Sequence, residues 1–190
     1  VMAASDEAEL VRMINTSTEI NDRPCAFRYP RGTGLGSILP SINEKIEIGK
    51  SKIIKEGKKL AILNFGARLN ETLKAAENLL KKGVPITVVD ARFAKPLDEN
   101  LIWQLATTHE AIMTIEEGSI GGFGSHVVNF LTKKGLMDSN LKFRSLTLPD
   151  IFIDQDTPDK MYKVANLDSV SIEEKVLDLL NSNIVLKKQN

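Results

Sequence analysis

The sequence predicts an α/β fold: a three-layer domain with helices on both faces of a mostly parallel sheet, preceded by a helix-strand remnant of another α/β domain. One observation is a set of continuous apolar runs at residues 60–65, 86–89 and 111–115, typical of buried parallel strands. Another is that helical periodicity fills the segments between these runs. Strands that alternate with helices favour right-handed crossovers and therefore a parallel sheet.

The remnant comes first in the chain. Residues 6–21 have a broad apolar face that predicts a helix, and Asp6 and Glu9 are spaced as in a capping box. Residues 25–29 predict a short strand, which a proline ends. One helix and one strand cannot form a core alone, because a core needs at least two packed layers. We therefore interpret residues 1–36 as the end of a preceding domain.

A linker separates the remnant from the main domain. Glycine, proline and serine are concentrated between residues 32 and 43, a composition typical of loops. We place the linker at residues 37–45 and the main domain at residues 46–190. Because the chain starts with valine rather than methionine, we expect it to continue a longer polypeptide.

The elements of the main domain follow from periodicity, capping residues and glycines at element ends. Residues 48–54 alternate apolar side chains with lysines, which predicts a strand. Apolar residues at helical spacing predict the helices, and Gly83 marks the end of the first of them. The later elements are, in order, a strand at 60–65, a helix at 69–80, a strand at 86–89, a helix capped by Asp98, a strand at 111–115, a helix at 127–131, a strand at 143–148, a short helix capped by Thr157 and a last helix with Ser171 and Glu174 as a capping box.

The composition excludes several function classes. The chain has 190 residues, 42% of them hydrophobic and 26% charged, and its formal net charge is zero. Neither a nucleic-acid nor a membrane partner is indicated, because both favour basic patches and because no apolar run approaches the ~20 residues that span a bilayer. A single cysteine, Cys25, excludes an intramolecular disulfide and favours a reducing compartment such as the cytoplasm.

The segment Tyr29-Pro30-Arg31-Gly32 provides the best candidate binding residue. Arg31 lies just past the carboxyl end of a predicted strand, where ligands bind in open α/β sheets. Its guanidinium fork suits a phosphate or carboxylate, because it donates two parallel charge-assisted hydrogen bonds. The alternative is that Arg31 forms a salt bridge between domains.

A glycine-rich string over residues 116–126 lies between a strand and a helix. It fits neither the Rossmann fingerprint nor a P-loop, so its glycines are interpreted as allowing a tight turn and close packing. Glu116 and Glu117 point to opposite faces of a strand, which favours salt bridging or loop anchoring over acid–base chemistry. His109 and His126 have no accompanying metal-ligand cluster and are assigned structural or surface roles.

Several of these strings together resemble one enzyme family. Residues 22–32, 89–98, 116–126 and 148–153 are similar, in order and spacing, to the end of the pyrimidine-binding domain and to the C-terminal domain of the 1-deoxy-D-xylulose-5-phosphate synthase family. That family belongs to the transketolase superfamily. The string at residues 29–32 and the Leu-Pro-Asp-x-Phe-Ile string point most narrowly to the synthases.

The resemblance implies a homodimer that uses thiamine diphosphate and Mg²⁺. It condenses pyruvate with glyceraldehyde 3-phosphate to 1-deoxy-D-xylulose 5-phosphate and CO₂, for isoprenoid synthesis. Arg31 matches the family's arginine that binds the aldehyde substrate's phosphate. The family's catalytic, cofactor and metal residues lie in N-terminal catalytic domains outside this sequence, so none is assigned here. We expect the isolated chain to be inactive and to contribute phosphate binding and dimer support.

Two other interpretations stay open at this point. The chain resembles, more loosely, other transketolases and the β-subunits of 2-oxoacid dehydrogenases. It could also be a freestanding, non-catalytic binding module with the same fold. For an enzyme of the synthase family we expect the cytoplasm, or the plastid in a photosynthetic eukaryote.

Overall fold

The structure, a computed structural model, describes residues 1–185, with side chains described to residue 181. The predicted end of the main domain at residue 190 therefore lies outside the described residues. The elements in chain order are β1 (Met2–Ala3), α1 (Glu7–Ser17), β2 (Phe27–Arg28), β3 (Lys52–Lys55), β4 (Leu60–Phe65), α2 (Leu69–Lys81), β5 (Thr87–Asp90), α3 (Glu99–Thr108), β6 (Ala111–Glu116), α4 (Phe123–Lys133), the 3₁₀ helix η1 (Leu136–Asp138), β7 (Lys142–Leu146), α5 (Pro158–Val164) and α6 (Ser169–Val185).

The main sheet has five strands in the order β3-β5-β4-β6-β7. The last four pair in parallel, which confirms the predicted mostly parallel sheet. Only β3 is antiparallel, at the edge, with an irregular register between Ile53 and Lys55. The alternating pattern at residues 48–54 predicted this strand, but only Lys52–Lys55 pairs with the sheet, since an edge strand has a partner on one side alone.

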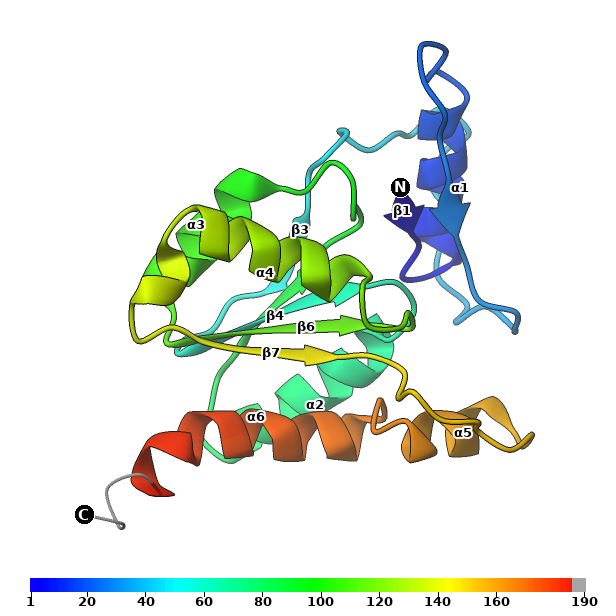
Figure 1. Ribbon diagram of the computed structural model, residues 1–190. Helices are drawn as coiled ribbons and strands as arrows, with labels where there is room; N and C mark the ends of the chain where they lie inside the picture. The colour runs from blue at the N-terminus through cyan, green and yellow to red at the C-terminus, as the bar shows by residue number, and fades with distance from the viewer. Residues whose placement is uncertain (186–190) are drawn as a thin grey trace.

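Helices cover both faces of the sheet, as predicted (Figure 1). Alternate residues of β4 divide the core: Leu63 packs toward α3 and α4, whereas Ile62 packs toward α2 and α6. All six residues of β4 and all six of β6 are buried, as continuous apolar runs indicate for parallel strands covered on both sides. Each such aliphatic side chain contributes about 1.5–3 kcal/mol to folding through burial. No helix among residues 1–185 is both long and apolar enough to cross a membrane.

The helix caps confirm some predicted boundaries and correct others. Asp6 and Asp98 cap α1 and α3, accepting hydrogen bonds from backbone N–H groups three residues later. Glu9 does not complete a capping box, because its carboxylate binds arginine side chains instead. The predicted box at Ser171 is also wrong: α6 begins at Ser169, and the carboxylate of Asp168 accepts the N–H of Ser171.

Residues 1–36 contain a separate two-stranded sheet, which lies beyond the carboxyl edge of the main sheet (Figure 1). The strands β1 and β2 are parallel, and α1 connects them. Backbone hydrogen bonds link Ala3 to Arg92 and Ala94 to Val1, on the loop that follows β5. The two-residue strand β1 was not predicted, and the division into domains at residues 36 and 45 stays a prediction.

Polar side chains lock this N-terminal segment onto the end of β5. The hydroxyl of Ser5 donates to Asp90 Oδ2 at 2.6 Å, and the backbone N–H of Arg92 donates to Asp90 Oδ1. The guanidinium group of Arg92 pairs with Glu9: Nη2 donates to Oε1, while Nε lies 2.8 Å from Oε2 without the geometry of a hydrogen bond. Burial raises the pKa of Asp90 from 3.8 to about 6, helped by the Glu9 charge and opposed by the Ser5 hydrogen bond and by Arg92.

Replacement of Asp90 with Asn is expected to flatten the pH dependence of stability. Since the folded-state pKa of Asp90 is raised, the native state holds this proton more tightly. The contribution of the protonated Asp90 to the free energy of unfolding is complete below about pH 4, and roughly 3 kcal/mol of it is lost as the pH rises through 6. Asn keeps an acceptor oxygen for the N–H of Arg92, and its NH2 group can donate to the rotated hydroxyl of Ser5, but it does not titrate.

The measurement is the free energy of unfolding by urea between pH 4 and 7, with the exposed Asp138→Asn variant as control. An Asp90→Asn variant with the wild-type pH slope would contradict the prediction.

Candidate functional site

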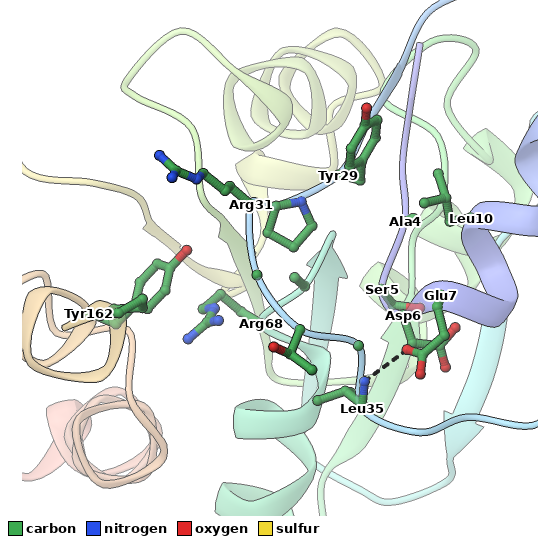
Figure 2. A pocket seen from close by; sticks show the side chains of 16 residues that line it. Ala4, Ser5, Asp6, Glu7, Leu10, Tyr29, Arg31, Leu35, Arg68 and Tyr162 are labelled. Carbon is green, nitrogen blue, oxygen red and sulfur yellow. Dashed lines mark hydrogen bonds between the residues drawn. The ribbon is translucent and has the colours of Figure 1, made fainter.

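The carboxyl edge of the parallel sheet carries the principal pocket of the site. In open α/β sheets, ligands bind beyond the carboxyl ends of the strands. Here a pocket of about 580 Å³ opens between the N-terminal segment, the start of α2 and α5 (Figure 2). Its lining comes from the beginning of α1, from residues 29–35, and from Arg68 and Tyr162.

Arg31, the predicted anion-binding residue, lines this pocket. It follows β2 by three residues, and Pro30 restricts the backbone just before it. Its side chain is exposed, and within residues 1–185 no hydrogen bond or ion pair engages its guanidinium group. Within the described residues Arg31 therefore has no salt-bridge partner, and both edges of its fork are open.

Arg28, three residues earlier, makes the salt bridge instead. Its Nη2 donates to the backbone oxygen of Glu117 at 3.1 Å and lies 3.4 Å from Glu117 Oε2. The other carboxylate oxygen, Oε1, accepts from Arg68 Nε at 3.1 Å and from the hydroxyl of Tyr162. The guanidinium carbon of Arg68 also lies 3.5 Å above the centre of the Tyr162 ring. One carboxylate thus joins β2, the start of α2 and α5 at a single junction.

The junction is buried on its acidic side. The side chain of Glu117 is only 2% exposed, so its charge depends on the donors around it for solvation. Burial, together with the hydrogen bond and the charge of Glu117, raises the pKa of Tyr162 to about 12, against the lowering effect of Arg68 and Arg28. Tyr162 is therefore protonated at neutral pH and acts as a hydrogen-bond donor.

The acidic residues on the opposite side of the pocket accept hydrogen bonds from residues 35–37. The carboxylate of Glu7 accepts hydrogen bonds from the N–H groups of Leu35, Gly36 and Ser37, at 2.5–2.9 Å. Asp6 Oδ2 accepts from the hydroxyl of Ser37. Hydrogen bonds from backbone amides, first its own and then that of Leu35, lower the pKa of Glu7.

The glycine-rich loop before α4 holds a carboxylate of the protein itself. Glu116 accepts hydrogen bonds from the N–H groups of Phe123 and Gly124, at 3.0 and 2.9 Å, and so occupies the first turn of α4. A Cβ atom on Gly122 would lie 2.2 Å from Glu116 Oε2, which explains why glycine is needed. The predicted roles are confirmed: Glu116 anchors this loop, and Glu117 bridges to the N-terminal segment.

The described residues do not fit a thiamine diphosphate and Mg²⁺ site. A diphosphate at the start of α4 would have to displace the buried Glu116 carboxylate from its amide donors. In the part of the chain that the structure describes, no three His, Cys, Asp or Glu side chains gather as a metal ion requires.

The two histidines lie away from the pocket. His109 is half-buried at the end of α3, where its Nδ1 faces the Leu105 carbonyl and its Nε2 lies 2.8 Å from the Thr87 hydroxyl. Because Nδ1 faces a carbonyl it carries the proton, and Nε2 accepts from Thr87. Burial lowers the pKa of His109, which favours this neutral form. His126 is exposed on α4, as a surface role requires.

Sequence reasoning missed Arg28, Arg68 and Tyr162 as members of the site. Arg28 lies within a strand pattern, and Arg68 lies between a buried strand and a helix without a recognisable motif. One signal was available for Arg68: it follows the carboxyl end of β4, the same kind of position that pointed to Arg31.

The three-layer fold defines an α/β domain with a mostly parallel sheet and a pocket beyond the carboxyl ends of its strands. Residues 49–172 match a family model described as the transketolase C-terminal domain. The chain belongs to that family.

A comparison of structures agrees with this assignment. The fold is similar to that of a protein described as a split gene transketolase, inactive β4 tetramer, with a TM-score of 0.80 and 25% sequence identity. The match covers 95% of this chain and 57% of that one, so the present chain spans little more than half of its relative.

Replacement of Gly122 with Ala is expected to destabilise the fold by about 1–3 kcal/mol. The added methyl group would collide with the Glu116 carboxylate, which is held by two backbone donors. The measurement is chemical denaturation of the purified chain. Gly32→Ala is the matched control, because no atom lies within 4 Å of its added Cβ, and it should change stability by less than about 0.5 kcal/mol. Equal stability of the two variants would contradict the assigned role of Glu116.

Proposed function

We propose that this chain is the C-terminal part of a thiamine-diphosphate-dependent synthase that condenses pyruvate with glyceraldehyde 3-phosphate to 1-deoxy-D-xylulose 5-phosphate and CO₂. The observation that carries the proposal is the unpaired guanidinium group of Arg31 in a pocket at the carboxyl edge of the sheet. A phosphate monoester is the ligand class that such a fork suits best. Glyceraldehyde 3-phosphate carries this group and pyruvate does not.

The positions of two sequence strings support the synthase over other transketolase-type enzymes. The two strings most similar to the synthases are residues 29–32 and 148–153. Both contribute to the lining of a second cavity of about 980 Å³, between β2 and α5. The backbone N–H of Leu148 also bonds to the Gly118 carbonyl, beside Glu117. The synthase-like strings therefore meet at one place in the fold.

Exposed apolar side chains on two loops support partners. The linker exposes Ile38 and Ile42, and the loop after β7 exposes Ile151 and the whole side chain of Phe152. Large apolar side chains exposed in neighbouring positions typically mark an interface. We propose that they pack against the enzyme's own N-terminal catalytic domains or in a homodimer, in the cytoplasm or, in a photosynthetic eukaryote, the plastid.

A second candidate is a subunit of a split transketolase. The similarity to a protein described as a split gene transketolase favours it. The assembled enzyme distinguishes the two candidates, because only the synthase consumes pyruvate together with glyceraldehyde 3-phosphate.

The cofactors of the proposed enzyme would be held by its N-terminal domains. We therefore predict that the 190-residue chain by itself has no synthase activity and negligible affinity for thiamine diphosphate. The measurement is a calorimetric titration with thiamine diphosphate in the presence and absence of Mg²⁺. Binding in the micromolar range that depends on Mg²⁺ would count against the prediction.

Replacement of Arg31 with Ala in the complete enzyme is expected to raise the KM for glyceraldehyde 3-phosphate at least tenfold, equivalent to about 1.4 kcal/mol. The KM for pyruvate should stay within about twofold, because pyruvate has no phosphate for Arg31 to bind. The measurement is steady-state kinetics with each substrate varied in turn. Arg23→Ala is the control, since Arg23 is exposed and already paired with Asp22. Equal effects on the two KM values would contradict the phosphate-binding role.

A further inference from the structure

Arg68 brings a second guanidinium group to the pocket that Arg31 lines. Its side chain is 15% exposed and is held in two ways. Nε donates to Glu117, and the guanidinium plane rests against the ring of Tyr162. A guanidinium group fixed by stacking and by one hydrogen bond loses little further entropy when it binds a ligand.

The part of Arg68 that remains available is the part that recognises anions. Within residues 1–185 its two Nη nitrogens make no hydrogen bond, so four of its five N–H donors are unused. Figure 2 shows the guanidinium groups of Arg31 and Arg68 on the side of the pocket that Tyr162 borders, with Asp6 and Glu7 on the other side.

The charges on the Tyr162 side of the pocket suit an anion. Arg31 and Arg68 line this side, whereas Asp6 and Glu7 line the opposite side and accept hydrogen bonds from residues 35–37. Arg28 and Arg68 share the carboxylate of Glu117, which leaves one positive charge in excess at that junction, and Arg31 adds a second. A phosphate monoester carries about −1.5 to −2 charges at neutral pH. The start of α2 has no side-chain cap, so its helix dipole adds to the positive potential beside Arg68.

The alternative for Arg68 is a purely structural role as the counter-ion of Glu117. Nε and the stacked ring account for that role fully. They do not account for the unused Nη donors at the wall of a 580 Å³ pocket that also contains an unpaired arginine. Neither Nη atom is buried without a partner, so solvent reaches both, and an anionic ligand can take the place of that solvent.

We propose that Arg68 is a second anion-binding residue, which with Arg31 forms a two-arginine clamp for a phosphate monoester. This inference rests on the proposed function, because both place the substrate's phosphate in the same pocket. It adds a contribution from the transketolase C-terminal domain itself, since Arg68 lies within the matched residues and Arg31 lies outside them.

The test uses glycerol 3-phosphate, an unreactive phosphate monoester, as the probe. Its dissociation constant for the 190-residue chain is measured by NMR titration. In Arg68→Gln the amide keeps a donor for Glu117 but removes the cation, and we expect at least tenfold weaker binding.

Arg68→Lys keeps the charge without the planar fork and should recover only part of the affinity. Arg31→Ala should also weaken binding at least tenfold, and the exposed Arg144→Ala, outside the pocket, should stay within twofold.

The outcomes separate the two proposals. If Arg68→Gln lowers the melting temperature but binds within twofold of wild type while Arg31→Ala weakens binding, Arg68 is structural and only the clamp is overturned. If Arg68→Gln weakens binding and Arg31→Ala does not, Arg68 is supported and the proposed role of Arg31 fails. If the wild-type chain shows no saturable binding at roughly 10 mM probe, the clamp is overturned, and the KM test on the complete enzyme decides the role of Arg31.

Discussion

One buried carboxylate, that of Glu117, holds the site together. Its side chain is almost fully removed from water, and the desolvation cost is offset because Arg68 and Tyr162 donate to the carboxylate and Arg28 forms an ion pair with it. Those three residues come from β2, from the start of α2 and from α5. The N-terminal segment is therefore positioned on the main domain by the same group that orients the arginine at the wall of the pocket.

The neighbouring residue Glu116 has a different role from Glu117, because adjacent side chains at the end of a strand point in different directions. Glu116 ends β6 and Glu117 follows it, and their side chains point in different directions: Glu116 binds the start of α4, and Glu117 contacts Arg28 of the N-terminal segment. Glu116 satisfies the N–H groups at the start of α4, which in other α/β proteins bind phosphate. We therefore expect an anion to bind at the arginine side chains beyond the carboxyl edge of the sheet rather than at the glycine-rich loop.

The sequence predicted the fold well where burial alone determines structure. The runs that became β4 and β6 are apolar because both faces of the sheet are covered. Prediction failed where structure depends on distant partners. The strand β1 has two residues and pairs only because β2 lies beside it. The candidate site was found in part, since Arg31 is marked by its proline and glycine, whereas Arg68 acquires its surroundings from Glu117 and Tyr162, distant in sequence.

The separation of these partners along the chain also bears on the order of folding. The contacts of Glu117 with Arg28, Arg68 and Tyr162 span 89, 49 and 45 residues. The strand pairs β4–β5 and β6–β7 close over 26 and 31 residues, and β4–β6 closes over 51. Long loops delay contact formation, because their closure entropy is lost before the contact stabilises anything. The contact between Arg28 and Glu117 is the longest of these, so we expect the N-terminal segment to dock after the parallel strands have paired. By the same reasoning, the amide hydrogens of β1 and β2 should exchange faster than those of β4 and β6 in native-state fluctuations.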